Sequence, residues 1–431
     1  MNKEGSLKDK SMSYPKIVKI RQILDNTQVE DISSAIKSEM NRLEVSSKIK
    51  SGSRVAISAG SRGITDIATI ISSIVREVKA FGGDPFIIPA MGSHGGGTAT
   101  GQKDILEDYG ITEKRVGAPV IPSMEVVKLG ETQSGIPVFV DQKAYEADHI
   151  IVVNRIKEHT EFQGQIESGI IKMMVIGLGK HKGATIAHQF AVKYGYERTI
   201  IEIGKYMLEK APVSLGIGIV ENGYGQTAQI TAINPSDFLR VETKLLQNAR
   251  TRTPKIPFDE MDILIVDECG KEISGTGMDT KVIGRIMNIY ELEVDKPKIT
   301  RIILRDLSKK THGNATGVGL ADFVTKRVVN KFDCKSTYVN CITGVTPEKG
   351  RLPMVCENDK EALDFAIATA GPLNLDKLRI VWIKNTSNLS ELFISQGLLA
   401  KAQGKEKLEI VGNMLEIKFD EHSNLIEFWG N

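Results

Sequence analysis

One pattern recurs along this chain and constrains its fold more than any other: a short apolar run, a glycine, and a stretch with apolar residues at helical spacing. Ser53–Ala59 is the first such run, and the helical stretch Thr65–Phe81 after it ends at two glycines. This alternation predicts a parallel sheet covered by helices on both faces. Further strands are expected at Pro85–Ala90, His149–Asn154 and Leu215–Val220, and further helices at Thr98–Tyr109 and Tyr196–Lys210.

A break follows at Asn248–Asp259, which is basic, contains two prolines and has no periodicity. We therefore predict a loose tail over residues 1–14, an N-terminal α/β catalytic domain over 15–250 and a C-terminal α/β domain over 251–431. The fold class is α/β, with two lobes, mainly parallel sheets and an interdomain cleft. In the second domain we expect strands at Asp262–Val266, Arg301–Leu304, Ser336–Val339 and Leu378–Ile383, helices at Ala321–Asn330 and Lys360–Thr369, and a terminal hairpin turning at Gly412-Asn413 and Glu421–Asn424.

The composition excludes several classes of protein. The 431 residues include 56 basic and 54 acidic side chains, a net charge of +2, so neither nucleic acid nor an anionic membrane is an expected partner. The N-terminus has no apolar signal region, and no run is long enough to span a membrane. The four cysteines form no paired motif. We expect a cytoplasmic protein that acts on a small molecule.

Three predicted strands are each followed by polar residues suited to chemistry: Arg62, His94 and His159. The carboxyl ends of parallel strands share one edge of a sheet, where ligands bind, so these side chains are expected to converge. The planar guanidinium of Arg62 suits a carboxylate or a phosphate. Each histidine can take or give a proton near neutral pH. Two such groups on opposite sides of a chiral carbon would suit inversion of configuration.

The segment Glu161–His188 holds further candidates. Lys172 lies within an apolar run, where it either extends its ammonium outward or, if buried, becomes a nucleophile. His188 follows a helix start expected at Thr185 and is either a metal ligand or a core imidazole. The glycine-rich stretch Gly177–Gly183 is a candidate phosphate cradle in which Gly179 and Lys182 would bind a cofactor. It matches neither a dinucleotide-binding fingerprint nor a P-loop.

In the second domain, the polar, glycine-rich loop after the strand at Asp262–Val266 is another candidate ligand contact. Asp279, Thr280 and Lys281 are its predicted substrate-binding residues, and a solvated loop is the alternative.

Together these residues resemble the nickel-dependent lactate racemase family. The resemblance rests on Ser61-Arg62, on Gly-Ser-His94, on Lys157-Glu158-His159 with Phe162 and Gly164, and on Lys172 with His188 sixteen residues later. It covers most of residues 50–200 and extends more weakly to the loop at Gly275–Arg285. Lys180 and Lys182 are alternative counterparts of Lys172, because the stretch after His159 is longer than is usual in the family.

The resemblance implies a nickel-pincer nucleotide as cofactor. Lys172 would be the tether that bonds to its thioacid group, and His188 would be the nickel ligand. His94 and His159 would be the paired acid–base residues, and Arg62 would hold the carboxylate of a 2-hydroxy acid while hydride leaves and returns at the α-carbon. The implied activity is that of an isomerase acting on a 2-hydroxy acid such as lactate. The polar, glycine-rich edge around His94 would also admit a larger acid, such as a sugar acid.

Two other functions stay open from the residues alone. One is an oxidoreductase that binds NAD or NADP at Gly177–Gly183. The other is a non-enzymatic protein that captures a carboxylate ligand through Arg62.

Overall fold

Strand and helix alternate to give two α/β units in the computed structural model, which describes residues 14–61, 63–371 and 374–429. The N-terminal unit consists of Leu24–Thr253 with Ile289–Leu292, and the C-terminal unit holds the rest of the described chain. The predicted fold class, α/β with mainly parallel sheets, is confirmed. The predicted division at residue 250 differs from the structure at the start of the chain, because β1 (Ile17–Gln22) pairs with strands of the C-terminal unit.

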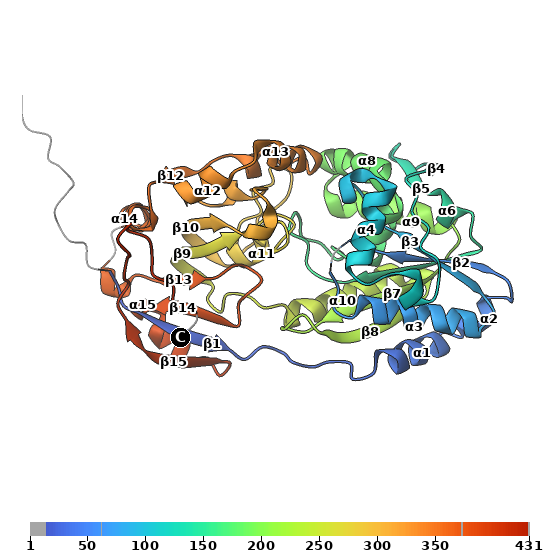
Figure 1. Ribbon diagram of the computed structural model, residues 1–431, viewed down its shortest axis with the longest axis horizontal. Coiled ribbons are helices and arrows are strands. Elements are labelled where there is room, and N and C mark those ends of the chain that lie inside the picture. The colour runs from blue at the N-terminus through green and yellow to red at the C-terminus, as the bar shows by residue number, and fades with distance from the viewer. Residues whose placement is uncertain (1–13, 62, 372–373, 430–431) are drawn as a thin grey trace, which may run out of the picture. The chain divides into compact units, whose positions relative to one another are not determined.

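The N-terminal unit is built on a five-stranded sheet in the order β3-β2-β6-β7-β8 (Figure 1). Its first four strands are parallel and β8 is antiparallel to β7. Between β3 and β6 in the sequence, β4 and β5 form a separate two-stranded antiparallel ribbon. The strands are β2 Arg54–Ala59, β3 Asp84–Pro89, β4 Val126–Glu131, β5 Pro137–Asp141, β6 His149–Arg155, β7 Val213–Glu221 and β8 Thr227–Ile233.

Helices bury both faces of this sheet, as the near-continuous apolar strands predict. Alternate residues of β6 enter different cores: Ile150 and Val152 pack with one set of helices, and Ile151 and Val153 pack with another. One core receives α7 to α10, and the other receives α1 and α3. The helices are α1 Ile32–Arg42, α2 Val45–Lys48, α3 Ile67–Ala80, α4 Ala99–Asp108, α5 Glu113–Val116, α6 Gln142–Tyr145, α7 Ile170–Lys172, the π-helix η2 Met173–Leu178, α8 Lys180–Tyr194, α9 Tyr196–Lys210 and α10 Phe238–Arg252.

The C-terminal unit has an eight-stranded sheet in the order β12-β11-β10-β9-β13-β14-β1-β15. The first five strands are parallel, and the last three are antiparallel to their neighbours. The strands are β9 Glu260–Cys269, β10 Lys298–Leu307, β11 Phe323–Thr325, β12 Met354–Cys356, β13 Ile380–Ile383, β14 Glu391–Ser395 and β15 Leu408–Leu415. The helices are α11 Thr280–Ile283, α12 Lys326–Lys331, α13 Cys334–Thr343, α14 Asp359–Thr369 and α15 Gln396–Gln403.

Two predicted elements of this unit are wrong. The strand expected at Ser336–Val339 lies inside α13, because the Asp333 side chain accepts a hydrogen bond of 2.6 Å from the Ser336 N–H group and begins a helix there. The helix expected at Ala321–Asn330 is instead the short strand β11 followed by α12, because Phe323 and Val324 pair with β10.

The end of the chain also differs from the prediction. Gly412-Asn413 is not a turn but lies within β15, which pairs with β1 across a register shift. The second expected turn is present, since Phe419 and Leu425 form an antiparallel bridge around it. Residues 1–13 of the predicted tail lie outside the described residues. In the described part of the chain, no helix has the length and apolar character needed to cross a membrane.

Candidate active site at the carboxyl edge of the N-terminal sheet

The loops that follow β2, β3 and β6 pack on one helical segment. A side chain at Gly60, after β2, would meet Met173 of η2, and one at Gly92, after β3, would meet Ala184 of α8 at 2.9 Å. Near the end of β6 itself, Asn154 donates a hydrogen bond of 2.8 Å from Nδ2 to the Gly169 carbonyl oxygen, just before α7. The carboxyl edge of the sheet is therefore closed by the α7–η2–α8 segment, which contains both Lys172 and His188.

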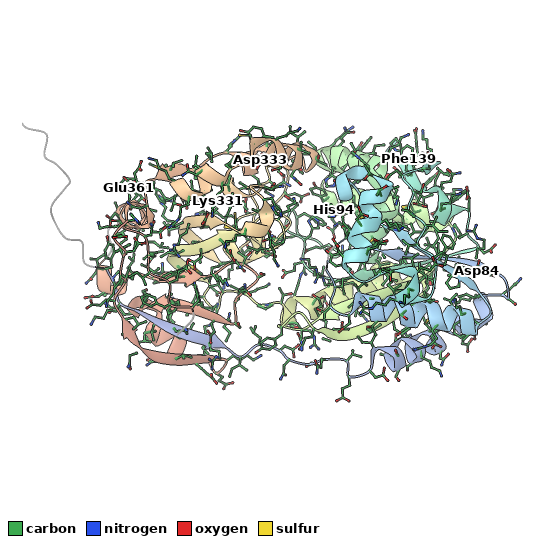
Figure 2. The ribbon with its side chains drawn as sticks, viewed as in Figure 1. Asp84, His94, Phe139, Lys331, Asp333 and Glu361 are labelled. Carbon is green, nitrogen blue, oxygen red and sulfur yellow. The ribbon has the colours of Figure 1, made fainter. Side chains whose placement is uncertain are left out.

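His94 lies in the loop after β3, beside the start of α4 (Figure 2). Its Nδ1 atom and the Ser61 hydroxyl, from the loop after β2, form a hydrogen bond. Two of the three loops are thus joined through this histidine. Arg62, the next residue after Ser61, lies outside the described residues, so its role stays a prediction.

His159 lies in the loop after β6 and is held from several sides. The Glu161 N–H group donates a hydrogen bond of 3.1 Å to its Nδ1 atom, so in the neutral ring the proton lies on Nε2. Its ring packs on Phe162, with the centroids 4.8 Å apart. The buried Glu167 carboxylate accepts from the His159 N–H group and forms an ion pair of 2.5 Å with Arg250 of α10.

Tyr196, the first residue of α9, joins His159 to His188. Its ring lies 6.2 Å from that of His159 and stacks on Phe162 at 5.3 Å. His188 meets it edge-on at 5.6 Å, and its Nδ1 atom is 2.9 Å from the Tyr196 hydroxyl oxygen. Tyr290 packs on another side of the same ring. Two histidines that are 29 positions apart in the sequence therefore share one buried tyrosine.

The charge state of this cluster follows from its burial. Burial and the nearby Lys172 ammonium lower the pKa of His188 to about 4, so the imidazole is neutral at pH 7. Burial raises the pKa of Tyr196 well above its usual value, so the hydroxyl keeps its proton. A neutral imidazole is the form that binds a metal ion.

Lys172 is the last residue of α7 and directly precedes the π-helix η2. Its side chain is half-buried, and its positive charge contributes to the lowered pKa of His188. Insertions of π-helix inside helical segments are frequent at functional sites. The Lys172 ammonium thus acts electrostatically on His188, which is consistent with their proposed joint role.

The two alternative lysines are engaged elsewhere. Lys180 is fully buried, and its Nζ atom lies 2.6 Å from the Pro89 carbonyl oxygen, 3.1 Å from Gln102 Oε1 and 3.3 Å from Asp141 Oδ2. Gln102 in turn donates to backbone carbonyl oxygens of the His94 loop. Lys180 therefore holds the base of that loop. Lys182 is exposed and lies over the Phe139 ring at 4.5 Å.

The stretch Gly177–Gly183 is helical rather than an extended loop, because it forms the end of η2 and the start of α8. A side chain at Gly179 would lie 2.2 Å from the Val175 carbonyl oxygen, so this glycine is explained by close packing. The helix that carries His188 begins at Lys180, five residues before the predicted start. The cofactor-binding role of Gly179 and Lys182 stays a prediction.

Asp279, Thr280 and Lys281 belong to the C-terminal unit, at the start of α11. The Asp279 side chain accepts a hydrogen bond of 2.9 Å from the Lys281 N–H group, and its own N–H group donates to Thr386 Oγ1. Thr280 and Lys281 are buried. Their substrate-binding role stays a prediction.

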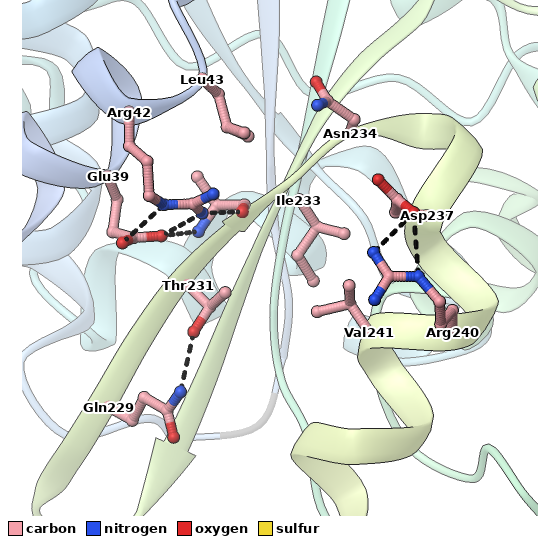
Figure 3. Close-up of a pocket in the computed structure, with 11 residues that line it drawn as sticks. Glu39, Arg42, Leu43, Gln229, Thr231, Ile233, Asn234, Asp237, Arg240 and Val241 are labelled. Atoms are coloured by element: carbon pink, nitrogen blue, oxygen red, sulfur yellow. Dashed lines mark hydrogen bonds and ion pairs between the residues drawn. The ribbon is translucent and has the colours of Figure 1, made fainter.

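A polar pocket of about 330 Å³ lies elsewhere in the N-terminal unit, beside α1, β8 and the start of α10 (Figure 3). Its two arginines are already paired, Arg42 with Glu39 at 2.6 Å and Arg240 with Asp237 at 2.8 Å. It contains none of the predicted site residues.

Among the described residues, no group of three or more His, Cys, Asp or Glu side chains is arranged to hold a metal ion.

Comparison with known proteins decides the family. Residues 7–199 match the family model described as the lactate racemase N-terminal domain. The chain carries the N-terminal domain of the lactate racemase family. The resemblance predicted from the sequence is confirmed. No curated protein matches the chain.

Solved structures show that the fold is shared beyond this domain. The lactate racemase apoprotein from Thermoanaerobacterium thermosaccharolyticum aligns with a TM-score of 0.51 and 12% identity, over 82% of this chain and 95% of that chain. A crystal structure of a Thermotoga maritima protein, a structural genomics target, aligns with a TM-score of 0.50 and 14% identity, over 63% of this chain and 70% of that chain. The likeness extends well into the C-terminal unit, of which the family model matches only the N-terminal segment from residue 7 to residue 23.

Several residues of the candidate site escaped the sequence analysis. Tyr196 was expected only as a helix residue, and the sequence holds no signal of its contact with His188. Glu242 of α10 is fully buried in a stripe otherwise formed by Phe238, Leu245, Leu246 and Ala249. An acidic residue within an apolar helical stripe is the pattern that would have pointed to Glu242.

Proposed function

We propose that this lactate racemase family protein inverts the hydroxyl-bearing carbon of a 2-hydroxy acid with the aid of a nickel-pincer nucleotide. The observation that carries the proposal is the cluster around Tyr196, which joins the proposed acid–base residue His159 to the proposed nickel ligand His188. The charge of Lys172, the proposed tether, reaches the same His188. Resemblance to the family supplies the reaction, and these contacts support the assignment of roles.

The donor set fits such a cofactor. His188 is a neutral imidazole whose Nδ1 atom contacts the Tyr196 hydroxyl. Its Nε2 atom is therefore the nitrogen that would bind a metal ion. Imidazole suits nickel, and one protein ligand suffices where the cofactor itself brings sulfur and carbon donors. A hydrogen bond to the second nitrogen of a metal-binding histidine is the usual arrangement, because it fixes the tautomer and the ring.

Each protein group has a defined task in this proposal. Lys172 holds the cofactor through its thioacid group. When bound, the cofactor supplies a hydride acceptor and donor for the α-carbon of the substrate. His94 and His159 take the hydroxyl proton on one side of that carbon and return it on the other. Arg62 holds the carboxylate, and the Phe162 and Tyr196 rings exclude water from the reacting centre.

The test uses the protein co-produced with the enzymes that make the cofactor. Enantiopure lactate and larger 2-hydroxy acids are incubated in D₂O, and chirality and deuterium content are measured. We expect interconversion of enantiomers with the α-hydrogen retained, and its loss in His159→Ala and Lys172→Ala but not in Lys182→Ala. Deuterium incorporation at the α-carbon would contradict hydride transfer. A nickel-loaded protein that interconverts none of the acids would overturn the proposed activity and favour a carboxylate-binding protein.

A further inference from the structure

The most unusual buried group near the proposed site is the carboxylate of Glu242. It lies on α10, on the face that packs against the core, and its side chain is fully buried. Burial raises the pKa of Glu242 to about 7. An apolar residue would suit this stripe better, since a buried carboxyl is costly unless its oxygens are hydrogen-bonded. Its presence therefore calls for a role other than packing.

The Glu242 carboxylate contacts the start of α7. Oε2 accepts a hydrogen bond of 3.0 Å from the Ile171 N–H group, and the Ile170 N–H group also donates to the carboxylate. These first-turn N–H groups have no partner within their own helix. The residue before them, Gly169, has no side chain that could accept from them. Glu242 thus does from a neighbouring helix what a capping side chain does locally.

The backbone of Gly169 packs closely against the same carboxylate. A Cβ atom at this position would lie 2.2 Å from Glu242 Oε1 and 2.5 Å from its Cδ atom. The backbone of Gly169 is extended, with φ at −167°, so any residue could adopt it. The three nearest atoms to that added Cβ all belong to Glu242, so this glycine is explained by the carboxylate beside it.

The second oxygen, Glu242 Oε1, is buried and has no hydrogen-bond partner among the described residues. A carboxyl that satisfies only one of its oxygens stabilises a fold poorly. It nevertheless fixes the backbone from one side, while Asn154 holds the carbonyl oxygen of Gly169 from the strand side at 2.8 Å. The entry to α7 is therefore held between β6 and α10.

We propose that Glu242 is a positioning residue that fixes the first turn of α7 and thereby aims Lys172, the last residue of that helix, toward His188. Lys172 follows Ile171 directly, so a shift of the Ile170–Ile171 amides moves the base of its side chain. The inference rests on the proposed function only in that Lys172 would bind the cofactor. The effect of Glu242 on the position of the Lys172 side chain does not depend on a cofactor.

The first experiment measures the reactivity of Lys172 in the full chain without cofactor. Acetylation by an amine-reactive ester is followed by peptide mass spectrometry, with Lys182 as the internal reference. In Glu242→Leu the labelling rate of Lys172 relative to Lys182 should change roughly fivefold, as loss of a helix cap predicts. In Glu242→Gln, which keeps an oxygen for the Ile171 N–H group, it should stay near that of the wild type. Equal rates in all three folded proteins would overturn the proposal.

A second measurement covers the case in which Glu242→Leu fails to fold. Gly169→Ala should lower the midpoint of urea unfolding in the wild-type background, and should have little effect in Glu242→Ala, which removes the atoms that the new methyl group meets. Equal effects in both backgrounds would refute the packing on which the proposal stands. Neither experiment depends on nickel or on turnover, so failure of the proposed function leaves both results interpretable.

Discussion

Replacing Lys180 by methionine should destabilise the protein strongly, although this residue takes no part in the proposed chemistry. The change keeps the length of the side chain but removes the ammonium that lies 3.3 Å from Asp141 Oδ2. Both side chains are fully buried, so the Asp141 carboxylate would be left as an unpaired buried charge. Breaking a buried pair in this way costs about 3–5 kcal/mol. The lost contacts to Pro89 and Gln102 act in the same direction.

The pH dependence of this loss has a defined sign. Burial already raises the pKa of Asp141 even with Lys180 present. A carboxyl whose pKa is higher in the folded than in the unfolded state opposes folding when it is ionised, and this opposition fades as the pH falls. The free-energy difference between wild type and Lys180→Met should therefore be largest near neutral pH and shrink in mildly acidic solution, where Asp141 takes up a proton.

The assay is urea unfolding followed by circular dichroism at several pH values. Lys172→Met is the matched control, because its half-exposed side chain should change the free energy of unfolding little. The double variant Lys180→Met/Asp141→Asn should recover much of the lost stability, since no charge stays buried and the amide oxygen can still accept from Ala144. A loss below about 1 kcal/mol for Lys180→Met at pH 7 would refute the argument, because it would approach the roughly 0.5 kcal/mol that is usual for surface substitutions.

Three further predictions concern the candidate site. Tyr196→Phe should lower retention of nickel by the loaded protein about tenfold, because the contact that orients His188 is lost; metal analysis after dialysis measures this, and unchanged retention would contradict it. Arg250→Met should reduce the free energy of unfolding by about 1–2 kcal/mol, since it removes the ion pair to the buried Glu167; thermal unfolding tests it, and an unchanged midpoint would count against that role. Lys182→Ala should keep both stability and cofactor loading, and loss of loading would revive Lys182 as the tether.

The strands that deliver the site could be predicted from the sequence because their signals are local. The apolar runs that became β2, β3 and β6 are each followed within a few residues by glycine or a polar turn, and the loops after them carry Ser61, His94 and His159. A short apolar run and the residues after it depend little on the rest of the chain. The position of these loops at one edge then follows from parallel pairing.

Elements that depend on distant partners were not predictable in the same way. β1 lies near the N-terminus, yet it pairs with β14 and β15 near the other end of the chain. Ser336–Val339 has the β-branched and aromatic residues of a strand, but the cap at Asp333 makes it a helix. Local preference loses to capping and pairing in such cases.

Candidate residues for the site could be chosen from the sequence, whereas the contacts that support them could not. Lys172, His159 and His188 were chosen by type and spacing, whereas Tyr196 and Glu242 act through contacts made across the fold. Nothing in the sequence around Tyr196 indicates that its hydroxyl meets His188, because that contact depends on how α8 and α9 pack. The glycines at 177–183 looked like a phosphate loop because close helix packing and loop flexibility require the same residue type.

The most direct test of the account is to locate the cofactor on the chain. The protein is co-produced with the enzymes that make the nickel-pincer nucleotide, and digested peptides are analysed by mass spectrometry together with the nickel content of the intact protein. We expect a single adduct on Lys172, with nickel retained in the wild type and lost in His188→Ala. An adduct on Lys180 or Lys182, or a fully loaded protein that keeps its nickel without His188, would contradict the site described here.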